Sequence, residues 1–348
     1  MMLCSLQAGR GIAAIAVAAF HLSIMMGLER YVGVAVFQDI TRFGEVGVDF
    51  FFVLSGFIIL MAHHADIGQP RALAHYVSRR AVRLFPVYWV YTLGLIAAVL
   101  VFGAAEAQVP TQWEDWLVTL SLVALNDYTP PLSVAWTLFH EIAFYGAFGV
   151  LIWNRKAGLL VLAVYAGVAL LMYQYASLAT RTPWTVYTSA YNLFFVLGMG
   201  AFLLYRRPGS GLPELLAGAC VLTAALALHP IPGDLSPLLI AIGLALLVAA
   251  ATKLERNGRV SVPAFMVFLG NASYSIYLTH LPVEGLVLKG ERALGLNNAI
   301  GPEFVFALTL VVTVAIGCAA YVIVERPLLA SLHGLLQRRY PRPQPGAA

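Results

Sequence analysis

The chain has 348 residues, of which 60% are hydrophobic and 11% are charged, against about 25% charged in a typical soluble domain. This composition excludes an ordinary soluble protein and indicates one whose solvent is lipid. The formal net charge is only +4, and no basic block alternates with exposed aromatic residues, so we expect membrane lipid and no nucleic acid as a partner.

Apolar runs of about 20 residues recur along the chain and predict an all-α polytopic membrane protein with about ten transmembrane helices. The predicted spans are 11–28, 46–62, 84–102, 135–153, 157–176, 187–205, 211–228, 235–252, 262–283 and 303–324. The stretch 116–125 is apolar but too short to cross, so we expect a re-entrant or interfacial helix before the fourth span. The first run lacks a convincing cleavage site and leads into further spans, which favours a retained helix over a signal peptide.

The positions of lysine and arginine predict the orientation. With the N-terminus inside, 16 of the 21 Lys and Arg residues fall in cytoplasmic segments and 5 fall on the opposite side. Cytoplasmic loops carry an excess of these residues, so we expect both termini in the cytoplasm.

One integral-membrane domain, residues 1–328, accounts for nearly the whole chain, and 329–348 are predicted to form a disordered cytoplasmic tail because the chain ends in RRYPRPQPGAA. The three cysteines lie far apart, at positions 4, 220 and 318, without metal-like spacing. We therefore expect no metal site and no disulfide framework. A homo-oligomer is compatible with the sequence, which does not fix the oligomeric state.

Arg10 directly precedes the first predicted span, and His21 lies within it. Eleven residues at about 100° each bring both side chains to nearly the same helix face, about 16 Å apart along the axis. An extended acyl thioester could contact both, with phosphates at the guanidinium and the acyl group near the imidazole. In the alternative, Arg10 only anchors the helix and His21 bonds a neighbouring carbonyl.

Two carboxylates are also expected within the membrane. Asp49 lies in the first turn of the second span. Either its carboxylate is only a helix cap, stabilised there by the helix dipole, or it orients the histidine of the first span. Glu141 lies about six residues inside the fourth span, and no Lys or Arg of that span can pair with it, which favours function over a helix contact. Thr137 and Tyr145 share its face, whereas His140 points about 100° away.

The ninth predicted span carries a polar stripe of Ser273, Tyr277 and His280, at i, i+4 and i+7. We expect the stripe to line an acceptor site, together with Tyr145 and Trp136 of the fourth span. The alternative is that its tyrosine and histidine belong to the aromatic belt of the membrane interface.

Three arginines precede the third span in HYVSRRAVRLFP. Arg79, Arg80 and Arg83 are three and four residues apart and so share one helix face. They fit either a clamp for the phosphates of an anionic cofactor or simple positive-inside anchoring.

These segments, taken in order, resemble the membrane-bound acyltransferase family 3, which includes O-acetyltransferases of exopolysaccharide, lipopolysaccharide O-antigen and some macrolides. The matching segments are RGIAAIAVAAFH, GVDFFFVLSGFII, RRAVRLFPVYW, WTLFHEIAFY, LGNASYSIYLTHLP and YVIVERP. They cover residues 10 to 327 and look most like the compact exopolysaccharide acetyltransferase branch.

The resemblance implies ten helices, acetyl-CoA or another acyl-CoA as donor, a saccharide or glycolipid hydroxyl as acceptor, and a bacterial cytoplasmic (inner) membrane. The residues that it marks are the essential pair Arg10 and His21, the paired arginines Arg80 and Arg83, the intramembrane acid Glu141, and Asp49 at the acidic position before the aromatic run.

We therefore expect a membrane-bound O-acyltransferase in which the arginines hold the cofactor phosphates. His21, oriented by Asp49 or Glu141, acts either as general base on a saccharide hydroxyl or as a transient acyl carrier. The sequence leaves both routes open.

Two other classes of protein compete with this interpretation. A proton-coupled transporter would use His21, Asp49 and Glu141 as a relay, but it predicts inverted repeats that the sequence does not show. A lipid-linked glycosyltransferase would more often carry acidic outer loops and require a metal or nucleotide.

Overall fold

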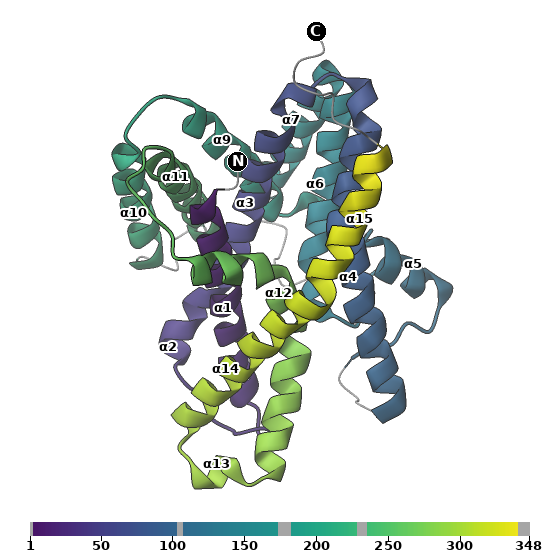
Figure 1. Ribbon diagram of the computed structural model, residues 1–348, viewed down its shortest axis with the longest axis vertical. Helices are drawn as coiled ribbons and strands as arrows, with labels where there is room; N and C mark the ends of the chain where they lie inside the picture. Colours follow the sequence, from purple (N-terminus) through teal and green to yellow (C-terminus); the bar gives the residue numbers. More distant parts are fainter. Residues whose placement is uncertain (1–2, 103–106, 173–181, 228–234, 340–348) are drawn as a thin grey trace.

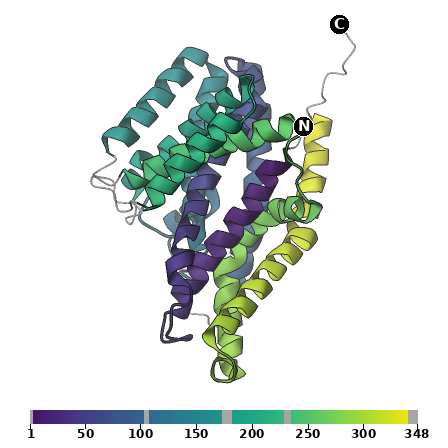
Figure 2. The ribbon, with the colours of Figure 1, turned by 90° about the vertical axis from the view of Figure 1, so that its left-hand side faces the viewer.

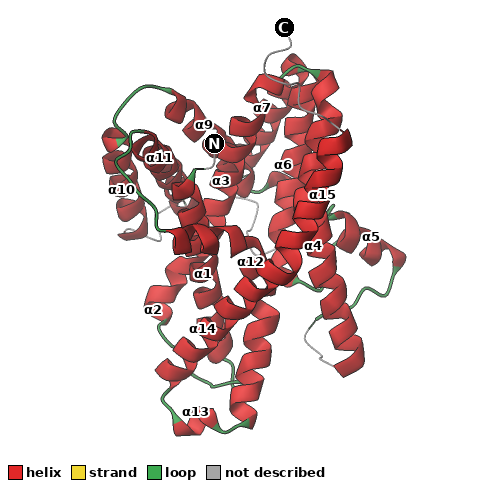
Figure 3. Ribbon diagram, viewed as in Figure 1, coloured by secondary structure: helices red, strands yellow, loops and turns green. Residues whose placement is uncertain are grey.

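The computed structural model describes residues 3–102, 107–172, 182–227 and 235–339. Within these ranges the regular elements are helices and no strand is present, which confirms the predicted all-α class (Figures 1 and 3). The α-helices are α1 (Cys4–Met26), α2 (Gln38–Thr41), α3 (Val46–His63), α4 (Leu73–Phe102), α5 (Trp113–Ser121), α6 (Trp136–Trp153), α7 (Arg155–Leu171), α8 (Pro183–Thr188), α9 (Tyr191–Arg206), α10 (Leu212–Ala227), α11 (Ser236–Arg256), α12 (Ala264–Ala293), α13 (Leu296–Ala299), α14 (Pro302–Ala320) and α15 (Arg326–Arg339). A turn of π-helix, Tyr321–Glu325, joins α14 to α15.

Seven helical segments of the described chain are long and apolar enough to cross a membrane. They contain α1, α3, α4, α6, α9 and α11, and the continuous run from α14 through α15. The other three predicted spans are helical too, in α7 with 17 residues, α10 with 16 and α12 with 30. The fold is therefore that of an integral membrane bundle with seven candidate spans.

Helix α1 connects the two halves of this bundle. It packs most extensively against α12, and it also contacts α3, α11 and α14 (Figure 2). Because these partners come from both halves of the sequence, the side chains of α1 meet residues more than 200 positions away.

The start of α1 is fixed by a carboxylate from the end of α11. Glu255 accepts hydrogen bonds from the backbone N–H groups of Cys4 and Ser5, at 2.7 and 2.8 Å, and from the Ser5 hydroxyl at 2.6 Å. The first N–H groups of a helix have no partner within it, and an anion there also interacts favourably with the helix dipole. This cap therefore helps to set the position of α1.

Glycines allow α3 and α9 to cross at very short range. A Cβ atom on Gly198 would lie 1.8 Å from the carbonyl oxygen of Val53, and one on Gly56 would lie 1.9 Å from that of Phe195. Helices in membranes associate through small residues of this kind because lipid supplies no hydrophobic drive between them. The crossing is thus specified by two reciprocal glycines.

Several helices differ in extent from the prediction; α1 begins at Cys4 instead of residue 11, and α4 begins at Leu73 instead of residue 84. Helix α5 begins at Trp113 instead of residue 116, since Glu114 and Asp115 favour its first turn, and it ends at Ser121, with Leu122 after it in the left-handed conformation. Helix α12 continues to Ala293, ten residues beyond the predicted end at 283.

The predicted tail is helical over much of its length. Helix α15 packs against α4 and buries Leu329, so the prediction of disorder is wrong for residues 329–339. The Pro-rich composition that suggested disorder begins only near Arg339, and 340–348 lie outside the described residues. Leucines before that point supply an apolar face that holds the helix on α4.

Candidate active site

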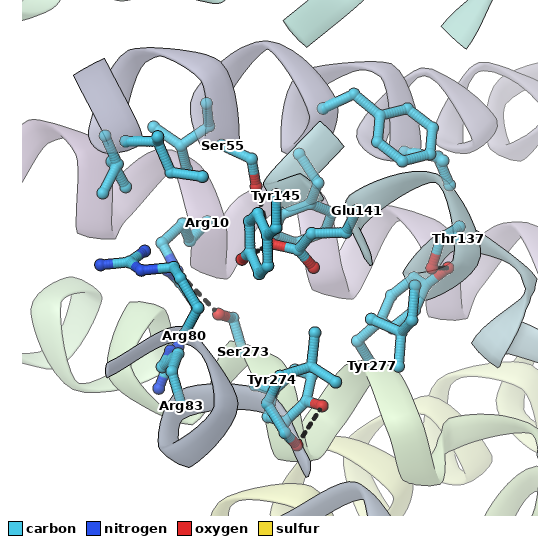
Figure 4. A pocket seen from close by; sticks show the side chains of 18 of the residues that line it. Arg10, Ser55, Arg80, Arg83, Thr137, Glu141, Tyr145, Ser273, Tyr274 and Tyr277 are labelled. Atoms are coloured by element: carbon cyan, nitrogen blue, oxygen red, sulfur yellow. Dashed lines mark hydrogen bonds between the residues drawn. The ribbon is translucent and has the colours of Figure 1, made fainter. Parts of the chain in front are cut away.

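A cavity of about 300 Å³ lies among α1, α3, α4, α6, α12 and α15. Figure 4 shows Arg10, Arg80 and Arg83 at one end of it, with Thr137 and Tyr277 at the other. The polar side chains that line the cavity are Arg10, Ser55, Arg79, Arg80, Arg83, Thr137, Glu141, Tyr145, Ser273, Tyr274, Tyr277 and His333. Most of the residues singled out in the sequence are therefore gathered around one space.

The arginine end offers a buried hydrogen-bond donor without a partner among the described residues. The Nε of Arg10 donates to Ser273 Oγ at 3.1 Å, and the guanidinium of Arg80 lies 5.9 Å from the centre of the Tyr145 ring. The Nε of Arg80 is buried and has no hydrogen-bond partner within the described residues. A buried donor without a partner is costly, so this end is built to receive a hydrogen-bond acceptor, and the positive charges favour an anion.

Arg83 differs because its charge is already compensated. Its Nη1 donates to Oε1 of Glu325 at 3.2 Å, and Ser275 donates to the other carboxylate oxygen at 2.6 Å. Glu325 is fully buried and lies in the π-helical turn between α14 and α15. A π-turn re-aims side chains at functional sites, and here it brings the acid of the closing VERP segment to the cavity arginine.

Glu141 occupies the middle of the cavity. It accepts hydrogen bonds from the Ser55 hydroxyl, at 3.2 Å, and from the Tyr145 hydroxyl. Thr137, Glu141 and Tyr145 all line the space, which confirms the predicted shared face. His140 points elsewhere, and its Nδ1 lies 3.2 Å from Asn192 Oδ1.

Tyr277 lies at the far end of the cavity. Its hydroxyl lies 3.2 Å from Thr137 Oγ1, and its ring centre is 5.8 Å from that of His280. The ring of His280 is in turn 5.0 Å from that of His21, with its Nε2 3.2 Å from His21 Nδ1. The two histidines thus lie next to Tyr277 and are not among the residues that line the cavity.

The structure therefore separates residues that the sequence grouped together. Arg10 lines the cavity, but His21 is held by His280 and by the carbonyl oxygen of Val17 at 2.9 Å. Asp49 lies in the first turn of α3, as predicted, but the α3 side chains that line the cavity are its neighbours. Trp136 begins α6 and packs on the His140 ring.

Three polar residues that line the cavity, and Glu325 beside Arg83, were not singled out from the sequence. Ser55 and Tyr274 are polar residues within apolar runs, and that depth was the signal available for them. Glu325 was visible only as part of a motif, and His333 was assigned to the tail. Their roles depend on helix packing that periodicity does not reveal.

A membrane-embedded helical bundle with an arginine-lined internal cavity is the class that the fold and site define. Residues 5–322 match the family model described as an acyltransferase domain, so the chain belongs to this acyltransferase family.

Two curated relatives align along most of the chain. The exopolysaccharide production protein ExoZ of Rhizobium meliloti (strain 1021) is 34% identical over 312 residues, covering 82% of this chain and 90% of the relative. The acyltransferase MdmB of Streptomyces mycarofaciens is 26% identical over 379 residues, covering 97% and 93%. No solved structure matches the chain significantly.

Proposed function

We propose that this membrane acyltransferase moves an acyl group, in the simplest case acetyl, from cytoplasmic acyl-CoA to a hydroxyl of a saccharide such as an exopolysaccharide or lipid-linked glycan. The observation that carries the proposal is a cavity with four arginines at one end, one of which has a buried donor without a partner among the described residues, and a histidine pair next to the other end. The family match and the name of the ExoZ relative support this acceptor class.

The arginine end fits the phosphates of the donor. Arg10 and Arg80 supply guanidinium donors, and Arg79 and Arg83 add positive charge beside them. Guanidinium groups pair bidentately with phosphate, which makes arginine well suited to this contact. The cavity has a volume of about 300 Å³, and we expect it to hold the thioester arm while the nucleotide part remains at the arginine end.

His21 supplies the lone pair for the transfer. In direct transfer it takes the hydroxyl proton while that oxygen attacks the thioester carbon, the C–S bond breaks, and the departing thiolate takes up a proton. In the relay, His21 attacks the thioester carbon first and the thiolate leaves; the saccharide hydroxyl then attacks the acyl group on the ring, the C–N bond breaks, and the hydroxyl proton passes to the thiolate. Both routes need the same nitrogen of the same histidine.

This function requires that the acyl-CoA donor reach the protein from the cytoplasmic side of a bacterial cytoplasmic membrane. We propose ten spans with both termini inside, α7, α10 and α12 completing the seven most apolar ones, and α5 re-entrant or interfacial. The distribution of lysine and arginine supports this orientation, and α15 ends on the same side of the bundle as the start of α1 (Figure 2).

The test follows label from acetyl-CoA, labelled in the acetyl group, into the glycan fraction of vesicles that contain the protein. We expect transfer with the unmodified protein and with Arg71→Ala, an exposed arginine outside the cavity. His21→Ala should abolish transfer, and Arg80→Ala should raise the KM for acetyl-CoA. Equal labelling with His21→Ala, at equal protein level, would refute the mechanism. If no label is transferred and the activity of the protein depends instead on an ion gradient, the transporter interpretation would be favoured.

A further inference from the structure

The histidine pair behind Tyr277 joins residues 259 positions apart. His21 Nδ1 lies 2.9 Å from the carbonyl oxygen of Val17, one turn earlier in α1. His280 Nδ1 lies 2.6 Å from the carbonyl oxygen of Tyr277, in the preceding turn of α12. The contact between the rings is from His280 Nε2 to His21 Nδ1, at 3.2 Å.

These distances determine where the protons are. A carbonyl oxygen only accepts hydrogen bonds, so the Nδ1 of each ring carries a hydrogen. Neutral His280 therefore has its lone pair on Nε2, the atom that faces the Nδ1–H of His21. The N–H of His21 is shared between the Val17 oxygen and this nitrogen, and the lone pair of His21 is on Nε2.

We propose that His280 is the positioning residue that holds His21 in the tautomer and orientation required for acyl transfer. The inference rests on the proposed function only for the role of His21, because the pairing itself is seen in the structure. In an acid–histidine pair, a carboxylate accepts a hydrogen bond from one ring nitrogen and leaves the other nitrogen to react. His280 takes the place of that carboxylate.

His280 is suited to this role by its own fixation. It is fully buried, and its ring is held by the Tyr277 carbonyl on one side and by His21 on the other. When Nε2 of His21 takes up a proton or an acyl group, the ring becomes positively charged and its Nδ1–H becomes a stronger donor. His280 Nε2 is placed to accept that bond without being ionised itself.

Val17 alone does not supply the same constraint. Its carbonyl oxygen also accepts the backbone N–H of His21, because the two residues are four apart within α1. The carbonyl is therefore shared by two donors, and His280 provides an acceptor that serves the ring only. In the described part of the chain no third His, Cys, Asp or Glu joins the two rings to make a metal-ligating group.

The test measures the tautomer directly in the full-length protein, labelled with ¹⁵N-histidine and placed in lipid nanodiscs. The ¹⁵N resonances separate ring nitrogens that carry hydrogen from those that carry a lone pair, and the His21 signals are the ones lost in His21→Gln. We expect His21 to be protonated at Nδ1 alone. His280→Phe keeps a ring of similar volume without the acceptor, so the lone pair should then be distributed over both nitrogens.

The matched variants separate positioning from folding. His140→Phe removes another fully buried histidine, on α6, and should leave the His21 signals unchanged. His280→Gln restores an acceptor oxygen and should recover the single tautomer. In the labelled-acetyl assay, His280→Phe should lower transfer by about tenfold, which is part of the roughly 10² to 10⁴ in rate that a general base contributes. His280→Gln should recover most of the lost transfer.

The outcomes are distinguishable. His21 signals that are the same in the unmodified protein and in His280→Phe would overturn the positioning role, as would undiminished transfer by that variant. If the unmodified protein transfers no label, the proposed function fails, whereas the ¹⁵N spectra still decide whether the histidine pair exists.

Discussion

The crossing of α3 and α9 gives a prediction whose size follows from geometry. In Gly198→Ala the new methyl group would lie 1.8 Å from the Val53 carbonyl oxygen, whereas ordinary contact begins at 3.4 Å. The obstacle is backbone, so the helices have to separate by about 1.6 Å. Overpacking of this kind costs about 1–3 kcal/mol, and we expect the upper part of that range because no side chain can move aside.

The control lies two residues further along the same helix. A Cβ on Gly200 meets nothing within 4 Å, so Gly200→Ala should be neutral or should stabilise by up to about 1 kcal/mol through helix propensity. The assay compares thermal unfolding midpoints of the purified variants in one detergent. Gly56→Ala clashes in the same crossing, and the double variant should cost less than the sum, because one separation relieves both clashes. Equal midpoints for the variants at 198 and 200 would refute this account of the crossing.

Three further changes test contacts made across the bundle. Glu255→Gln removes the charged cap of α1 and should lower the free energy of unfolding by about 1 kcal/mol, measured by denaturant titration; an unchanged midpoint would contradict the cap. Tyr145→Phe removes a donor to Glu141 and should lower the kcat of labelled-acetyl transfer more than it raises the KM; an effect on KM alone would assign the pair to donor binding. Glu325→Gln leaves the charge of Arg83 uncompensated and should lower the free energy of unfolding by about 2 kcal/mol. This is less than the roughly 3–5 kcal/mol of a fully buried pair, because the arginine side chain is 34% exposed. No loss of thermal stability would show that the pair is not structural.

The sequence predicts well whatever depends on one helix. Apolar runs locate the membrane helices, and an angle of 100° per residue correctly places Thr137, Glu141 and Tyr145 on one face toward the cavity. The same rule puts Arg10 and His21 on nearly one face, and both lie on sides of α1 that meet α12. The helical period predicts the helix face on which a side chain lies, because that face depends only on the geometry of the one helix.

The partners of those faces could not be predicted in this way. His21 meets His280 at a separation of 259 residues, and Arg83 meets Glu325 at 242. Each pairing depends on which helices touch, and close approaches such as the one at Gly198 decide that. The predicted orientation of His21 by Asp49 or Glu141 followed from chemistry alone, since a carboxylate is the commonest partner of a catalytic imidazole.

A neutral partner for His21 also suits the charge balance of the site. Four arginines at one end of the cavity, Glu325 beside Arg83 and Glu141 in the middle sum to a formal charge of two positive units, which favours an anionic donor. A carboxylate beside His21 would add a buried negative charge along the path of that donor, and its desolvation would require compensation. His280 can orient the ring through one hydrogen bond without adding charge. The attraction for the donor then stays concentrated at the arginine end of the cavity.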